Sequence, residues 1–62
     1  MKCKTDEKTF ELEFQGTVAE LLKKLNIRRE TVIVKANGRI VPENEMLGPD
    51  DTVEIMRVIF GG

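Results

Sequence analysis

Two glycines, Gly61 and Gly62, have the clearest chemical potential in this sequence, because they close the chain behind a strand-like run over residues 53–60. Glycine lacks a Cβ and permits backbone angles that other residues avoid. Such an end can be threaded into another protein's active site, where the carboxylate of Gly62 can react. The alternative is a frayed end that is glycine by chance, and the rest of the sequence has to distinguish the two.

The remaining side chains offer few means of catalysis within the chain itself. The sequence contains no His, Ser, Trp or Tyr, which removes Ser/His and Cys/His nucleophile pairs and the commonest general base. A single Cys and no His leave too few ligands for a structural zinc site. We therefore expect that the protein is not an enzyme and that it has no cofactor of its own.

The single thiol, Cys3, alternates with Lys2 and Lys4. This period of two places Cys3 on the core face of a strand, together with Met1 and Thr5. A buried free cysteine behaves as a small hydrophobic residue. We therefore favour a structural role over a redox or sulfur-carrying one, and a small domain with one thiol fits a reducing cytoplasm.

Length and charge narrow the class of protein further. The 62 residues suffice for one small domain. Ten Lys and Arg against eleven Asp and Glu leave no basic patch for a nucleic-acid backbone. No apolar run approaches the ~20 residues that span a bilayer, and no signal-peptide pattern is present. We expect a cytoplasmic monomer that contacts neither nucleic acid nor membrane directly.

The first half of the sequence predicts a hairpin followed by a helix. Apolar and polar residues alternate over residues 1–5 and 9–15, which is typical of two half-buried strands. Gly16 ends the second strand, and Thr17 with Glu20 forms a capping box. Asn26 is a favourable stop after the helix. The helix carries one apolar stripe at i, i+3, i+4 and i+7: Val18, Leu21, Leu22 and Leu25.

The second half predicts three more strands. Residues 31–36 are rich in β-branched side chains, and Asn37-Gly38 is the strongest short signal for a hairpin turn. Residues 39–41 return from that turn, residues 43–48 are a loop or a single helical turn, and residues 52–59 are the last strand. One helix must cover one face of a mixed sheet, which is a two-layer α+β domain. We expect the apolar stripe to pack on Phe10, Leu12, Phe14, Val32, Val34, Val53 and Ile55.

Three segments together resemble the ThiS/MoaD sulfur-carrier family of the ubiquitin-like β-grasp superfamily. Residues 32–42 match its apolar strand, Asn-Gly turn and Ile-Val-Pro return, and residues 47–55 match its turn and Val-Glu-Ile strand. The third segment is Gly61-Gly62. The turn differs, because the Gly and Asp of the family's turn appear here as Pro49 and Asp50, shifted around Gly48. The approach to the glycines, residues 58–60, favours ThiS over MoaD.

The resemblance implies a mechanism and a set of partners. A ubiquitin-activating-type enzyme would use ATP to adenylate the Gly62 carboxylate, with Gly61 passing through its channel. A sulfur donor would then give a thiocarboxylate for a downstream biosynthetic enzyme, with a thiamin-like pathway favoured over molybdopterin or tRNA thiolation. The domain would span residues 1–60, and residues 61–62 would be a flexible tail.

Recognition by a partner requires a rigid surface, and strand parity suggests one. Val53 and Ile55 are assigned to the core, so Met56, Val58 and Phe60 share the opposite face of the last strand. Ile33 extends this apolar strip, and exposed strips of this kind commonly mark interaction sites. The alternative is that Val58 or Phe60 folds onto the edge of the core.

Two other functions remain open from the sequence. The protein could be a modifier that is joined through Gly62 to lysines of a target. It could also be a non-covalent β-grasp interaction module whose glycine end is incidental. Activation of the carboxylate is shared by a sulfur carrier and a protein modifier, so the sequence does not separate these two functions.

Overall fold

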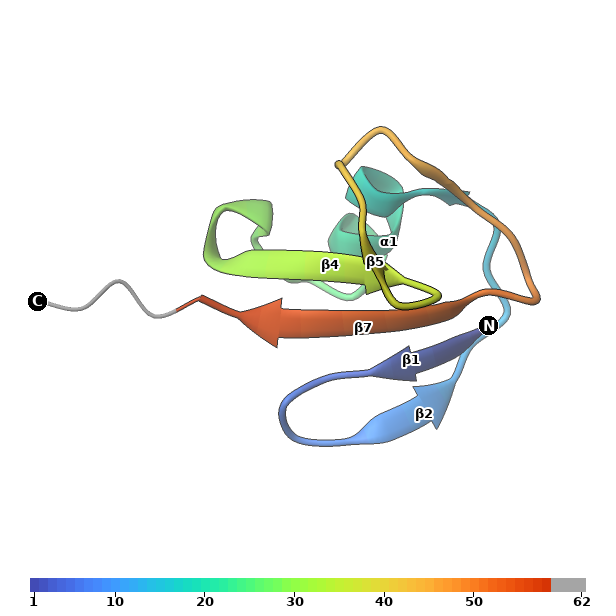
Figure 1. The fold of residues 1–62 in the computed structure, drawn as a ribbon, viewed down its shortest axis with the longest axis horizontal. Coiled ribbons are helices and arrows are strands. Elements are labelled where there is room, and N and C mark those ends of the chain that lie inside the picture. Colours follow the sequence, from blue (N-terminus) through green and yellow to red (C-terminus); the bar gives the residue numbers. More distant parts are fainter. Residues whose placement is uncertain (59–62) are drawn as a thin grey trace, which may run out of the picture.

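The protein is a two-layer α+β domain, described by a computed structural model over residues 1–58 (Figure 1). Within these residues a five-stranded mixed sheet has the order β2-β1-β7-β4-β5. The central strand β7 runs parallel to β1. The other neighbouring strands in the sheet pair antiparallel to each other. The strands are β1 Lys2–Lys4, β2 Thr9–Glu11, β4 Val32–Ala36, β5 Arg39–Ile40 and β7 Thr52–Arg57.

One α-helix, α1 Val18–Lys24, packs its apolar stripe against one face of this sheet. Leu21 is fully buried, and Leu22 and Val18 are nearly so. They join strand residues of β1, β4 and β7 in a single hydrophobic cluster. The predicted helix and its inward face are therefore confirmed. The buried hydrophobic residues are Met1, Cys3, Val18, Leu21, Leu22, Val34, Ala36, Leu47, Val53 and Ile55.

Local hydrogen bonds fix both ends of α1. The backbone N–H of Glu20 donates to the Thr17 hydroxyl, and the Glu20 carboxylate accepts from the Thr17 N–H at 2.8 Å, which completes the predicted capping box. A Cβ on Gly16 would lie 2.8 Å from Glu20 Oε1, so glycine leaves room for this carboxylate. At the other end Asn26 has φ 60°, and the Ile27 N–H donates to the carbonyl of Leu22.

The Asn37-Gly38 turn forms as predicted, with φ values of 53° and 86°. Its Asn37 side chain also links two turns at one end of β7. The Asn37 amide donates to Asp51 Oδ1 at 2.9 Å, and Asn37 Oδ1 accepts from the Thr52 N–H. Asp51 Oδ2 accepts from the Gly48 N–H at 2.7 Å. These bonds to Gly48 and Asn37 lower the pKa of the Asp51 carboxyl.

Two predictions about secondary structure were wrong. The loop or helical turn expected over residues 43–48 contains a strand, β6 Met46–Leu47, which pairs with β3 Gly16–Thr17 in a separate two-stranded sheet. The second strand was expected to reach residue 15, but β2 ends at Glu11. Such short strands carry no periodicity, so only their pairing defines them.

The expected core was correct for the centre of the sheet and incomplete at its margins. Val34, Val53 and Ile55 are buried, whereas Phe10, Leu12, Phe14 and Val32 are only partly buried and pack against the cluster. Leu47, which is 2% exposed, belongs to the core because β6 brings it there. The last strand was expected to reach residue 59, but it ends at Arg57 and Val58 lies outside it; residue 59 is outside the described residues. None of the helices in this described part is long and apolar enough to cross a membrane.

Candidate functional site

An apolar pair, Ile33 and Met56, lies on the sheet face that α1 leaves uncovered. The two residues are directly opposite each other in the β4–β7 ladder, and opposite residues share a face. Their neighbours Val34 and Ile55 are buried under the helix, which fixes Ile33 and Met56 on the other side. Ile33 is 38% exposed and Met56 is half-buried. The predicted parity of both residues is thus confirmed.

A row of charged residues crosses the sheet beside this pair. Glu54 of β7 is opposite Lys35 on β4 and Lys4 on β1. Since these residues alternate with the buried positions of their strands, they lie on the same helix-free face. The face therefore combines an apolar pair with two lysines that flank a carboxylate. A docking partner would need an apolar surface with complementary charges beside it.

The end of β7 is held from both sides by groups outside the ladder. The N–H of Val58 donates to the carbonyl of Thr31 at 2.8 Å. The N–H of Arg57 donates to Oδ2 of Asp6 at 3.2 Å, although these residues are 51 positions apart. Val58 is half-buried here. Residues 59–62 start from this doubly held point.

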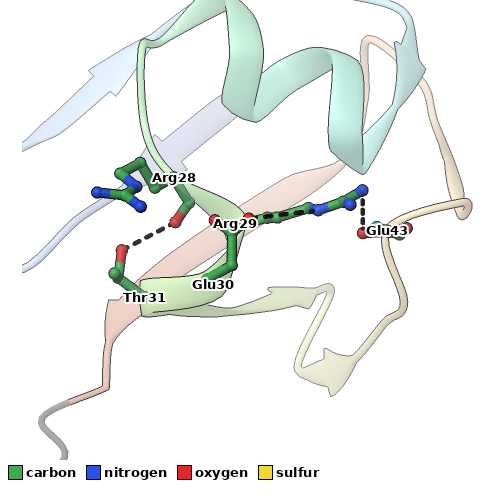
Figure 2. A network of polar contacts seen from close by, with 5 residues as sticks. All are labelled: Arg28, Arg29, Glu30, Thr31 and Glu43. Carbon is green, nitrogen blue, oxygen red and sulfur yellow. Dashed lines mark hydrogen bonds and ion pairs between the residues drawn. The ribbon is translucent and has the colours of Figure 1, made fainter.

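Thr31 belongs to a short 3-10 turn, η1 Arg29–Thr31, which is held in place by polar contacts (Figure 2). The Thr31 hydroxyl donates to the Arg28 carbonyl at 2.8 Å. Arg29 forms an ion pair with Glu43 at 2.7 Å, and both side chains are exposed. Figure 2 shows the Arg29 side chain reaching across from the turn to Glu43 on the loop that follows β5. This ion pair connects the turn to the loop that follows β5.

An open hollow of about 270 Å³ lies beside the end of β7, between η1 and the turn that joins β1 to β2. Its polar lining includes Asp6, Asn26, Arg28, Thr31 and Arg57. Charges of both signs meet in it. Among residues 1–58, no group of three or more His, Cys, Asp or Glu side chains is arranged to hold a metal ion.

Cys3 lies apart from this region. Its side chain is fully buried in the core on β1, opposite Phe10 on β2 and Val53 on β7. Burial raises the pKa of the Cys3 thiol, which keeps it protonated and poorly nucleophilic. The geometry thus supports the structural role predicted for this residue.

Three of the predicted site residues lie in the described part of the chain. Ile33 is on β4, Met56 is on β7, and Val58 directly follows β7. Phe60, Gly61 and Gly62 lie outside the described residues. Two contributors were missed by the sequence reasoning, Asp6 and Thr31. Nothing in the local pattern around Asp6 indicates that its carboxylate meets a backbone N–H far along the chain.

A mixed sheet with β1 parallel to a central β7, antiparallel outer strands and one helix across one face defines a ubiquitin-like β-grasp domain. The family model described as the ThiS family matches residues 1–62, and the chain belongs to that family. It is also similar to the crystal structure of the thiamine biosynthesis protein ThiS from Geobacter metallireducens. The TM-score is 0.69 with 25% sequence identity, over 100% of both chains.

Membership of the ThiS family gives the class of activity. Members are small sulfur-carrier proteins that work with partner enzymes in sulfur transfer and are not enzymes themselves. The predicted fold and family are therefore confirmed.

Proposed function

We propose that this protein carries sulfur as a thiocarboxylate on the C-terminal carboxyl group of Gly62. The observation that carries the proposal is the family match over residues 1–62, which includes Gly61 and Gly62. The expected division into a domain of residues 1–60 and a tail of residues 61–62 is part of this proposal.

In the proposed reaction a ubiquitin-activating-type enzyme binds the domain together with ATP. An oxygen of the Gly62 carboxylate attacks the α-phosphorus and displaces pyrophosphate, which gives an acyl adenylate. A carboxylate is a poor electrophile until it carries such a leaving group. A sulfur donor then displaces AMP and leaves a thiocarboxylate. Gly61 passes through the enzyme's channel because it has no side chain to clash.

The surface for this partner is the strip of Ile33, Met56, Val58 and Phe60. Support for the strip comes from the exposure of Ile33 and from its pairing with Met56 on the helix-free face. The row of Lys4, Glu54 and Lys35 would orient the partner on that face.

The recipient of the sulfur is a downstream biosynthetic enzyme, and we favour a thiamin-type pathway. The Geobacter protein is named for thiamine biosynthesis, and its structure matches this chain over the full length of both. We place the protein in the cytoplasm as a monomer, with ATP bound by the partner enzyme only.

Intact-mass measurement tests the proposal. The purified protein is incubated with ATP, the adenylating enzyme from the same cell and a sulfide source. We expect one oxygen to be exchanged for one sulfur on the C-terminal peptide. Deletion of Gly62 should abolish the exchange, and extension of the chain beyond Gly62 should also block it, because the carboxylate is then displaced. A Lys23→Arg variant, exposed on α1, serves as a control and should react normally.

Two results would contradict the proposal. Isopeptide adducts of Gly62 on lysines of other proteins would make this a protein modifier. A wild-type protein that forms neither an adenylate nor an adduct with any adenylating enzyme of its own cell would be a non-covalent module.

A further inference from the structure

Asp6 occupies an unusual place at the point where the C-terminal segment leaves the sheet. Its carboxylate accepts a hydrogen bond from the Arg57 N–H at 3.2 Å. The next residue, Val58, donates its N–H to Thr31 at 2.8 Å. Because successive N–H groups of a strand point to opposite sides, the two bonds hold the end of β7 from its β1 side and from its β4 side.

The ladder itself cannot supply the partner for Arg57. β1 pairs with β7 only from Lys2↔Thr52 to Lys4↔Glu54. The chain then turns back at residues 5–8, where the Thr5 N–H donates to the carbonyl of Lys8 at 2.8 Å. Arg57 therefore lies beyond the last β1 residue in the ladder. The side chain of Asp6, from this turn, takes the place of the missing strand carbonyl.

We propose that Asp6 is a positioning residue for the proposed adenylation of Gly62. It anchors the start of the C-terminal segment, so that the carboxylate reaches the partner's ATP from a fixed point on the docked domain. This inference rests on the proposed function. It assigns no contact between Asp6 and the reacting atoms.

The physical reason is the short reach of the segment. The four residues after Val58 span at most about 14 Å when fully extended. If residues 57 and 58 also come free of the sheet, the unanchored segment grows from four to six residues. Effective concentration falls roughly as the −3/2 power of length, which is a factor of about two. A segment that no longer leaves the sheet in a fixed direction should slow the reaction further, because reaction requires orientation as well as proximity.

The test compares three variants of Asp6 with one control. Asp6→Ala removes the acceptor, and Asp6→Ser keeps a polar turn residue whose oxygen is one bond too short. Asp6→Asn keeps an acceptor oxygen at the same distance but removes the charge. Glu7→Ala, in the same turn, removes a negative charge that makes no side-chain hydrogen bond within residues 1–58.

Two readouts separate positioning from a merely structural role. The first is amide hydrogen exchange at Arg57 and Val58. The second is the rate of pyrophosphate release by the adenylating enzyme from the same cell with ATP. It gives kcat and the KM for this protein as the substrate. For Asp6→Ala and Asp6→Ser we expect faster exchange at Arg57, a fall in kcat of about two- to fivefold and an unchanged KM. Asp6→Asn should recover most of the loss, and Glu7→Ala should match the wild type.

Several results would overturn the inference. Unchanged exchange at Arg57 in Asp6→Ala would show that the hydrogen bond does not hold the strand end. Faster exchange with wild-type kcat would show that anchoring does not matter for reaction. A rise in KM with unchanged kcat would make Asp6 a docking contact instead. A wild-type protein that is never adenylated would refute the proposed function itself. A wild-type protein that is adenylated, with the same kcat in Asp6→Ala, would refute only the role of Asp6.

Discussion

Replacement of Ile33 by alanine tests the proposed docking surface most directly. Ile33 retains 38% of its surface in contact with solvent, opposite Met56 on the helix-free face. Full burial of an isoleucine side chain is worth about 1.5–3 kcal/mol, so burial of the exposed 38% by a partner contributes about 0.6–1.1 kcal/mol. We therefore expect Ile33→Ala to weaken binding of the adenylating enzyme about three- to sevenfold.

Calorimetric titration of the adenylating enzyme with the wild type and the variant would measure this change in Kd. Most of Ile33 is already buried in the free protein, so Ile33→Ala should also lower the free energy of unfolding by about 1–2 kcal/mol. The titration is therefore done well below the melting temperature of the variant. Met46→Ala is the matched control, because Met46 is 63% exposed but lies on β6 in the separate two-stranded sheet. An unchanged Kd for Ile33→Ala, or an equal loss for Met46→Ala, would refute the assignment of this face.

Three further predictions follow from the core and the turns. Leu22→Ala should lower the free energy of unfolding by about 2–5 kcal/mol in a denaturant melt, since Leu22 is almost fully buried, and a loss below about 0.5 kcal/mol would contradict its place in the core. Cys3→Ala should also lower stability but leave sulfur transfer to the C-terminus intact by mass spectrometry, and loss of transfer in a folded variant would show that the thiol takes part. Because hydrogen bonds lower the pKa of Asp51, its contribution to stability is present above about pH 4 and is lost as pH falls through the lowered pKa. Asn37→Ala should therefore destabilise the protein most near neutral pH and progressively less in acid, and a loss that is the same at pH 7 and pH 2 would exclude this carboxylate as the cause.

Much of the fold could be predicted because its signals are local. The Thr17 and Glu20 capping box depends on residues three apart, and the left-handed residue Asn26 follows the C-cap of the helix, Leu25. The Asn37-Gly38 turn depends on two adjacent residues that both tolerate positive φ. The signal of each of these motifs comes from residues close together in the sequence, so it can be recognised before the sheet and helix are assembled.

The candidate site was predictable only in part. Alternation along each strand placed Ile33 and Met56 away from the core, because a period of two assigns every residue to a face. Their position opposite each other required the register of β4 with β7, which alternation alone does not specify. The anchoring of β7 by Asp6 left no trace in the sequence, because the bond joins residues 51 positions apart.

Residue types and their order specify the helix with its caps, the hairpin turn, the faces of the long strands and, through the family match, the sulfur-carrier class. Each of these depends on residue types at fixed short spacings or on their order along the whole chain. The tertiary structure alone decided that β3 pairs with β6, that Leu47 enters the core and that Asp6 reaches Arg57. These contacts are decided by how the two layers pack, since a two-residue strand or an exposed carboxylate finds its partner only after the sheet and helix have assembled.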